Sequence, residues 1–135
     1  MTPVNVQVFG FNDDAETRKA LRFFSERRIP VHFVNLTERP AAKGELRRFQ
    51  EKFGAAALID RESPKFRALG FHVRGDSPER LLERALTEPR ILKTPLVRIG
   101  GKVGIGIAPD DWQTWIDAER ARAVPPSPGG TPRRS

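Results

Sequence analysis

Residues 4–36, VNVQVFGFNDDAETRKALRFFSERRIPVHFVNL, carry the pattern that decides the fold. Val4, Val6 and Val8 alternate with polar residues, and this alternation predicts a strand that runs to Phe9.

A helix and a second strand complete this stretch. Asp13 or Asp14 is placed to cap a helix that begins after the turn, and Pro30 ends it. Residues 32–36 then form a second apolar run, which predicts a strand parallel to the first. The crossover between parallel strands is right-handed, so residues 4–36 read as a βαβ unit.

The C-terminal third predicts a hairpin followed by a helix. Residues 96–99 and 102–107 are β-branched runs, and Gly100-Gly101 joins them. A two-residue glycine loop predicts a type I′ turn, which needs positive φ at both central residues. Pro109 then begins a helix.

The remaining segments are a helical insertion and a tail. Residues 41–89 predict about three short helices, one of them capped by Ser77 with Pro78 at its first position. The predicted fold class is therefore α/β, a thioredoxin-like four-stranded mixed sheet (βαβ, then ββα) with this insertion between its second and third strands. We expect one domain over residues 1–121 and a disordered, basic Pro/Gly tail over residues 122–135.

Composition excludes several classes of chemistry. The chain has 135 residues, a formal net charge of +7 and no cysteine. It therefore makes no disulfide, carries no thiol nucleophile and holds no thiolate-bound zinc. We see neither a membrane span nor a secretory leader, so we expect a cytoplasmic protein without a membrane partner. The positive charge fits nucleic acid or an acidic protein.

Four segments together identify a family resemblance. The chain resembles the glutaredoxin-coupled arsenate reductases, a family that also includes the Spx class of transcription regulators, over about residues 4–116. The segments are VQVFGFNDDAETRKAL (6–21), LIDRESPKFRALGF (58–71), SPERLLERAL (77–86) and EPRILKTPLVRIGGKVGIGIAP (88–109).

The resemblance implies an altered active site. Reductases of this family place a cysteine at the N-terminus of the first helix, where this chain has Asp14, followed by Ala15. They also hold the oxyanion with three arginines, and the matching positions here are Asp60, Thr94 and Ile107. The resemblance therefore implies that these former active-site positions carry no catalytic residue.

Other residues of this region are candidate contacts. The resemblance implies a cis proline at Pro95, facing the first helix. A one-residue slip in the match at Asp60 would bring in a neighbouring cation. The cations considered for binding are Arg18, Arg61, Lys93 and Arg90. Arg18 stands one turn after Asp14, so we expect an i,i+4 ion pair between them.

The two aspartates admit two interpretations. Asp13 and Asp14 can simply cap the helix, which contributes about 1 kcal/mol. Alternatively, a carboxylate at this position mimics a permanently charged thiolate toward a partner. In either case an entering oxyanion would meet like charge, to which Asp60 adds, instead of a guanidinium fork.

The histidines, the glycine-rich stretch and the tryptophans fit structural roles better than catalytic or binding roles. His32 and His72 have no second imidazole at ligand spacing, and no metal-binding motif is present in the sequence. The glycines of residues 100–106 fit a hairpin better than a phosphate-binding loop. Trp112 and Trp115 share one helix face, which is more typical of core than of a recognition surface.

Three functions remain open. The first is a redox-inactive relative of the reductases, a pseudoenzyme that acts as a protein-binding and transcription-regulatory module; the Spx resemblance implies RNA polymerase as partner. The second is a glutathione-dependent reductase or thiol-transfer protein. The third is nucleic-acid binding through arginines. We expect no cofactor and no metal; glutathione would enter only in the second case.

Overall fold

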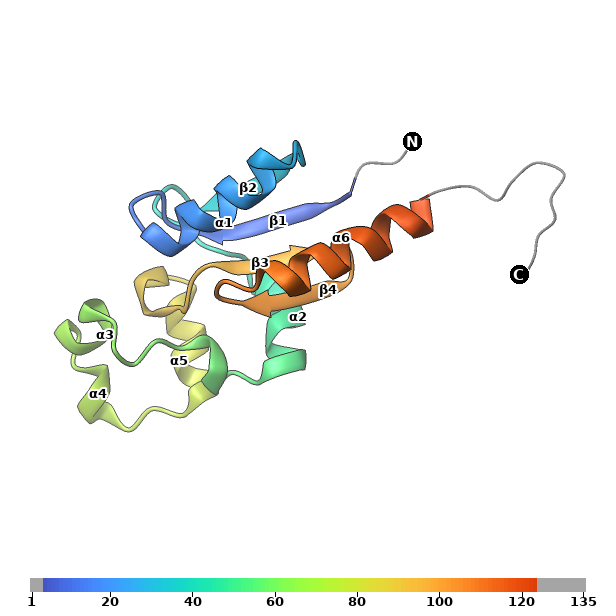
Figure 1. The fold of residues 1–135 in the computed structure, drawn as a ribbon. Helices are drawn as coiled ribbons and strands as arrows, with labels where there is room; N and C mark the ends of the chain where they lie inside the picture. The colour runs from blue at the N-terminus through green and yellow to red at the C-terminus, as the bar shows by residue number, and fades with distance from the viewer. Residues whose placement is uncertain (1–3, 124–135) are drawn as a thin grey trace, which may run out of the picture.

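The structure is a computed structural model that describes residues 4–123 (Figure 1). In chain order its elements are β1 (Val6–Gly10), α1 (Ala15–Glu26), β2 (Val31–Asn35), α2 (Lys43–Phe53), η1 (Ala56–Leu58), α3 (Pro64–Ala68), α4 (Phe71–Arg74), α5 (Pro78–Ala85), η2 (Pro89–Ile91), β3 (Leu96–Ile99), β4 (Lys102–Ile105) and α6 (Pro109–Ala123).

The four strands form one mixed sheet in the order β2-β1-β3-β4. β1 pairs with β2 in parallel and with β3 antiparallel, so Val8 lies between Phe33 and Val97. β3 and β4 pair as a hairpin. This is the thioredoxin-like α/β arrangement that the sequence predicts.

Each face of the sheet carries its own hydrophobic cluster. On one face, Val8 and Val97 pack with Phe24 of α1 and Trp112 of α6. The opposite face packs Phe9 and its neighbours against α2 and the other helices of the insertion. Adjacent residues of β1 therefore serve different clusters, as the alternation of a strand requires. Figure 1 shows the result: α6 runs across β3 and β4, and the insertion extends to one side.

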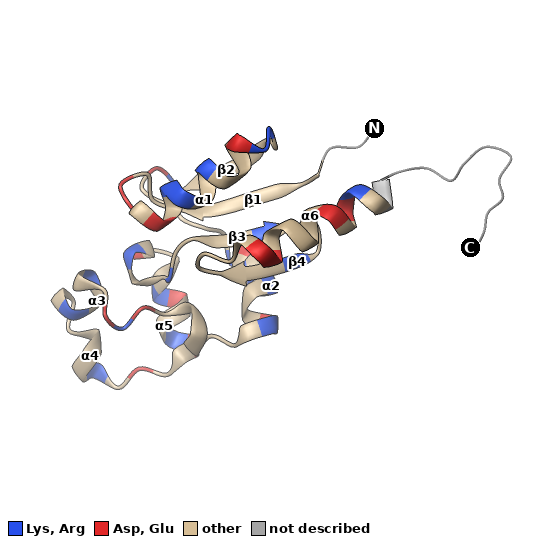
Figure 2. Cartoon of the chain, viewed as in Figure 1, with Lys and Arg blue, Asp and Glu red and all other residues tan. Residues whose placement is uncertain are grey.

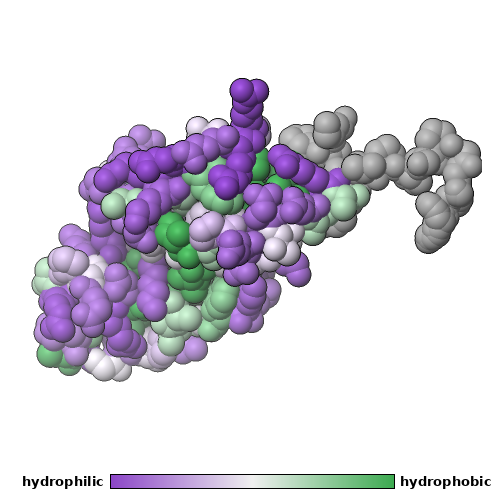
Figure 3. Space-filling model, viewed as in Figure 1, coloured by the Kyte–Doolittle hydropathy of each residue, from purple (hydrophilic) through white to green (hydrophobic). Residues whose placement is uncertain are grey.

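The C-terminal helix faces the core, as the sequence analysis favours. Trp112 is 1% exposed and tilts against the Phe24 ring, with 5.3 Å between ring centroids. Trp115 lies over Gly104 of β4, where a Cβ atom would come within 3.1 Å of the indole. In Figure 3 hydrophobic residues gather near the middle of the visible face, between hydrophilic residues on either side.

Three local expectations are wrong. The return strand β4 ends at Ile105 rather than at residue 107. The hairpin turn is not type I′, because Gly100 has a φ of 59° while Gly101 is outside the positive-φ region; a positive φ at the first position alone is typical of type II′. The insertion contains four α-helices and a 3-10 turn, because the four residues of α4 form a separate turn between two left-handed glycines.

Two further points concern regions beyond the sheet. The expected tail over residues 122–135 falls largely outside the described residues. Within residues 4–123, no helix combines the length and the apolar character that crossing a bilayer requires.

Candidate functional site

A cavity of about 300 Å³ opens at the N-terminus of α1. It gathers Asp14, Asp60, Thr94 and Arg90, four residues that the sequence analysis singled out from distant segments. Its complete lining is Phe11, Asp13, Asp14, Asp60, Ser63, Pro64, Arg90, Leu92 and Thr94.

Asp14 occupies the centre of a hydrogen-bond network. Its Oδ2 accepts from the Thr17 amide at 3.3 Å, the Thr17 hydroxyl at 2.7 Å and the Thr94 hydroxyl at 2.9 Å. Its Oδ1 accepts from the Glu16 amide at 3.4 Å. The carboxylate therefore caps α1 and also ties the helix to the segment that enters β3.

Thr17 is a residue of this network that sequence reasoning missed. It is fully buried, and its hydroxyl also accepts from the Phe11 amide at 3.4 Å. It can approach β1 closely because residue 10 is glycine: a Cβ at Gly10 would overlap the Thr17 side chain. Its position three residues after the Asp14 cap was the available signal, since capping bonds reach this position.

Asp13 and Arg90 form a second, more exposed pair. Arg90 Nη1 and Nη2 donate to the two carboxylate oxygens of Asp13, each at 3.1 Å. The guanidinium also lies 3.9 Å from the centroid of the Phe11 ring. These hydrogen bonds from Arg90, together with its positive charge, hold the pKa of Asp13 below its usual value. Arg90 is thus neutralised by the protein itself.

A short backbone pairing places Asp60 beside this pair. The Asp60 amide donates to the Ile91 carbonyl at 2.8 Å, next to an antiparallel bridge between Ile59 and Leu92. One carboxylate oxygen of Asp60 accepts from the Glu62 amide at 3.0 Å. Ser63 closes the same loop, because its hydroxyl donates to the carbonyl of Arg90 at 2.7 Å.

The other positions that the resemblance marks do not line the cavity. Ala15 is the exposed first residue of α1. The Thr94–Pro95 peptide bond is cis, as the resemblance implies, and Pro95 is buried. Ile107 does not line the cavity; it packs against the hydrophobic cluster beneath α1 and α6.

The remaining candidate cations do not line the cavity. The expected ion pair between Arg18 and Asp14 is wrong: Arg18 donates to the Asn12 carbonyl at 3.1 Å, because Asp14 turns toward Thr17 and Thr94. Arg61 lies 5.7 Å from the Phe66 ring centroid. Lys93 is exposed, and its amide donates to the Leu58 carbonyl.

The arrangement is poorly suited to oxyanion chemistry. Three carboxylates and one guanidinium line the cavity, and that guanidinium already binds Asp13. Among the described residues, no group of three His, Cys, Asp or Glu side chains is placed to hold a metal ion. His32 contacts Gln7 at 3.3 Å and His72 is exposed, so neither belongs to the cavity.

Comparisons with known proteins give the family of the chain and match its fold. The model of the ArsC family matches residues 10–115, more than half of the chain. The YFFB (PA3664) protein superposes with a TM-score of 0.74 at 20% identity, covering 83% of this chain and 99% of its own. An arsenate reductase from Vibrio cholerae superposes with a TM-score of 0.71 at 16% identity, covering 84% of this chain and 98% of its own. A putative arsenate reductase from Yersinia pestis superposes with a TM-score of 0.70 at 21% identity, covering 82% of this chain and 99% of its own. No curated protein matches the chain.

Proposed function

We propose that this chain, which belongs to the ArsC family, binds a protein partner through the cavity at the N-terminus of α1. We propose further that it performs no thiol chemistry. The observation that carries the proposal is the Asp14 network. A carboxylate with hydrogen bonds from Thr17, Thr94 and Glu16 stands where the resemblance implies a cysteine.

The chemistry of the chain argues against reductase activity. Thiol-based reduction proceeds through a thiolate that forms a covalent bond to the substrate. The sequence contains no cysteine, and a carboxylate cannot be oxidised to a disulfide. The single guanidinium of the cavity is paired with Asp13, so an arsenate ion would have to displace an internal carboxylate and then face Asp14 and Asp60.

The charges around the cavity favour a protein over nucleic acid. Figure 2 shows acidic residues in the loop that enters α1 and basic residues on the helix directly after it. Phosphate backbones reward uniformly positive surfaces, whereas protein interfaces use both signs for register and specificity. In agreement with the Spx resemblance, we propose a regulatory partner and name RNA polymerase as the first to be tested.

A capture experiment with matched charges tests this proposal. The site variant is Asp14→Asn with Asp60→Asn, which removes two charges while the new asparagine side chain can still cap α1. The control is Glu26→Gln with Asp117→Asn. It removes the same charge near the far end of α1, since Arg27 at that end bonds Gln113, which in turn bonds Asp117.

The readout is the amount of partner that each immobilised variant retains, identified by mass spectrometry from host extract and repeated with purified RNA polymerase. We expect the site variant to lose about fivefold or more in retention, and the control to match the wild type. Equal retention of the partner by the site variant and the wild type would contradict the proposal. A chain truncated after residue 123 adds a third arm: capture that disappears with residues 124–135 alone would place the interaction there.

A further inference from the structure

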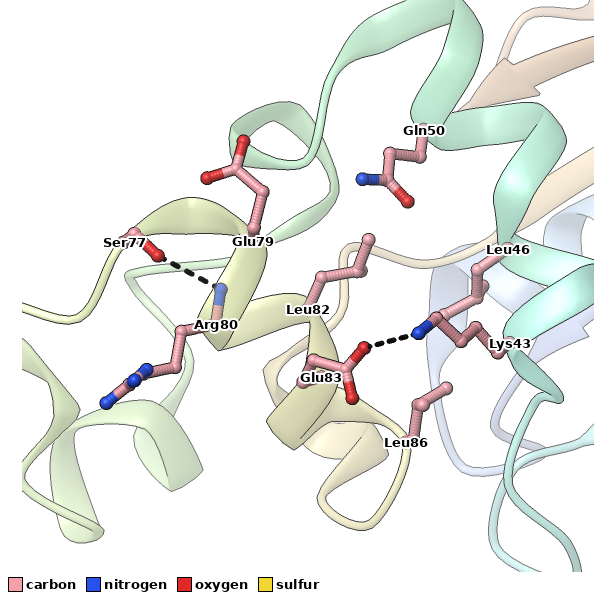
Figure 4. Close-up of a pocket in the computed structure, with 9 residues that line it drawn as sticks. All are labelled: Lys43, Leu46, Gln50, Ser77, Glu79, Arg80, Leu82, Glu83 and Leu86. Atoms are coloured by element: carbon pink, nitrogen blue, oxygen red, sulfur yellow. Dashed lines mark hydrogen bonds and ion pairs between the residues drawn. The ribbon is translucent and has the colours of Figure 1, made fainter.

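A second groove lies between α2 and α5, on the insertion side of the molecule. It has a volume of about 540 Å³ and shares no lining residue with the cavity at the N-terminus of α1. Its size falls within the range of ligand pockets. Lys43, Leu46 and Gln50 of α2 form one wall; Ser77, Glu79, Arg80, Leu82, Glu83 and Leu86 form the other (Figure 4).

The walls of the groove are preformed. The Ser77 hydroxyl accepts from the Arg80 amide at 3.2 Å and so caps α5. Lys43 and Glu83 join the two walls through an ion pair of 3.0 Å, and both side chains are more than half exposed. Because such exposed pairs contribute little free energy, a ligand can displace this one at small cost.

The floor of the groove is apolar. Leu46 and Leu82 are 2% and 7% exposed, and Leu86 packs against the same cluster. In Figure 4, Leu82 points from α5 into the space between the helices, and Leu86 lies below it. These three leucines form a seat for one branched apolar side chain.

The rim carries polar groups whose side chains have no partner within residues 4–123. Gln50 is partly buried, and its carboxamide points into the groove without a hydrogen bond to any described residue. Glu79 at the opposite wall has no ion pair with a described residue, and the Arg80 guanidinium points away from the groove. A carboxamide offers one acceptor and two donors, the complement of a peptide backbone.

Charge and length restrict the ligand further. The α5 wall presents Glu79 and Glu83, while the cation among the residues that line the opposite wall is Lys43, which is already paired with Glu83. The Arg80 guanidinium of the α5 wall points away from the groove, so Glu79, which has no ion pair with a described residue, favours a cationic side chain in the ligand. From Lys43 to Gln50 the helix rises about 10 Å, which accommodates about three residues of extended chain.

We propose that the groove between α2 and α5 binds an extended peptide segment of a protein partner. A leucine-sized side chain lies on Leu46, Leu82 and Leu86, the Gln50 carboxamide bonds the peptide backbone, and an adjacent lysine or arginine faces Glu79. This is a site additional to the cavity at the N-terminus of α1, and its failure or success leaves the proposed function unaffected.

The test is a titration of the full chain with three dipeptides, followed through backbone amide chemical shifts. Acetyl-leucyl-lysinamide is the matched probe; acetyl-glycyl-lysinamide lacks the apolar side chain, and acetyl-leucyl-glutamamide reverses the charge. We expect saturable shifts in α2 and α5 with the matched probe and at least about fivefold weaker binding of the other two.

Two variants and a control complete the design. Gln50→Ala should weaken the matched probe about threefold or more. Glu79→Lys should invert the preference between the lysine and glutamate probes, an effect that a merely structural role would not produce. Glu51→Lys, on an exposed residue of α2 outside the lining, should change neither. Shifts outside α2 and α5, equal binding of the glycyl probe, or unchanged binding in both variants would overturn the proposal.

Discussion

The N-terminus of α1 and the α2–α5 groove treat their polar groups in opposite ways. At α1 the polar side chains of the cavity are paired within the chain. Asp14 accepts hydrogen bonds from two hydroxyls and two amides, and Asp13 forms an ion pair with Arg90. In the groove, Gln50 and Glu79 have side chains without a partner among the described residues, above a leucine floor. At the position that the family resemblance marks, the polar side chains are therefore hydrogen-bonded to other groups of the same chain.

This difference has an energetic consequence. Groups that are bonded to one another stabilise the fold, and a ligand must break those bonds before it can replace them. Groups that face only water give little stability and are available for a ligand. Substitutions that break the Asp14 network should therefore lower stability as well as partner capture, whereas substitutions in the groove should change ligand binding and leave stability nearly unchanged.

The largest effect should come from two glycines, one in each region. Gly10→Ala forces a methyl group into the Thr17 side chain and should lower the free energy of unfolding by about 2–3 kcal/mol. Gly44→Ala in α2 meets nothing within 4 Å and should raise it by up to about 1 kcal/mol, since alanine favours helix. Urea unfolding measures both. Equal effects at the two sites would refute the close packing of α1 on β1.

The two N-caps give the next largest difference. Asp14→Ala removes a cap and leaves the buried Thr17 hydroxyl without its acceptor, so we expect a loss of about 2 kcal/mol. Ser77→Ala removes only the bond to the Arg80 amide and should cost about 1 kcal/mol. Thermal unfolding of both variants compares them. A Ser77 variant that is as damaging as the Asp14 variant would remove the energetic distinction between the regions.

A smaller effect concerns pH. The Arg90 hydrogen bonds lower the pKa of Asp13, so their stabilisation is present above the usual aspartate pKa of about 4 and is lost as the pH falls through the lowered value. Arg90→Gln should move the Asp13 carboxyl titration, followed by ¹³C NMR, upward to about that usual value.

Glu45 is the internal control for this titration. Hydrogen bonds from Arg39 lower its pKa in the same way, and Arg90 takes no part in that pair. The Arg90 variant should therefore leave the Glu45 midpoint unchanged. An Asp13 midpoint that also stays in place would show that the bidentate pair does not form in solution.

The outcome shows which features a single sequence can reveal. β1, α1 and β2 follow from local periodicity, and the Asp14 and Ser77 caps from the residues at the helix starts. α4 was not predicted, because four residues between glycines give no periodic signal. The turn type was wrong because Gly-Gly accepts either of two φ combinations.

The candidate site was predicted only in part, for a physical reason. Asp14, Asp60 and Thr94 were named through the family resemblance, but their partners depend on contacts between distant segments. Asp13 and Arg90 are 77 positions apart, and Asp14 meets Thr94 across 80. The expected ion pair between Arg18 and Asp14 was based on helix spacing alone. It does not form, because Asp14 bonds Thr94, a residue far away in the sequence. The α2–α5 groove arises in the same way, from two helices whose packing no local pattern encodes.

The last comparison restores the missing thiol. Asp14→Cys places a cysteine at the N-terminus of α1, where a helix end favours the thiolate. We expect no arsenate reduction by this variant with glutathione and glutaredoxin, because Asp60, Thr94 and Ile107 provide no oxyanion clamp and Arg90 remains bound to Asp13. Efficient turnover would show that other residues hold the oxyanion and that the correspondence with the three arginines is misplaced.

The decisive measurement is the rate of arsenate reduction by the unmodified chain in the presence of glutathione and glutaredoxin. We expect a rate equal to that of the mixture without the protein, because Asp14 and its hydrogen-bond network stand where the resemblance implies a thiolate. A protein-dependent rate that survives repurification and scales with the concentration of the chain would contradict it.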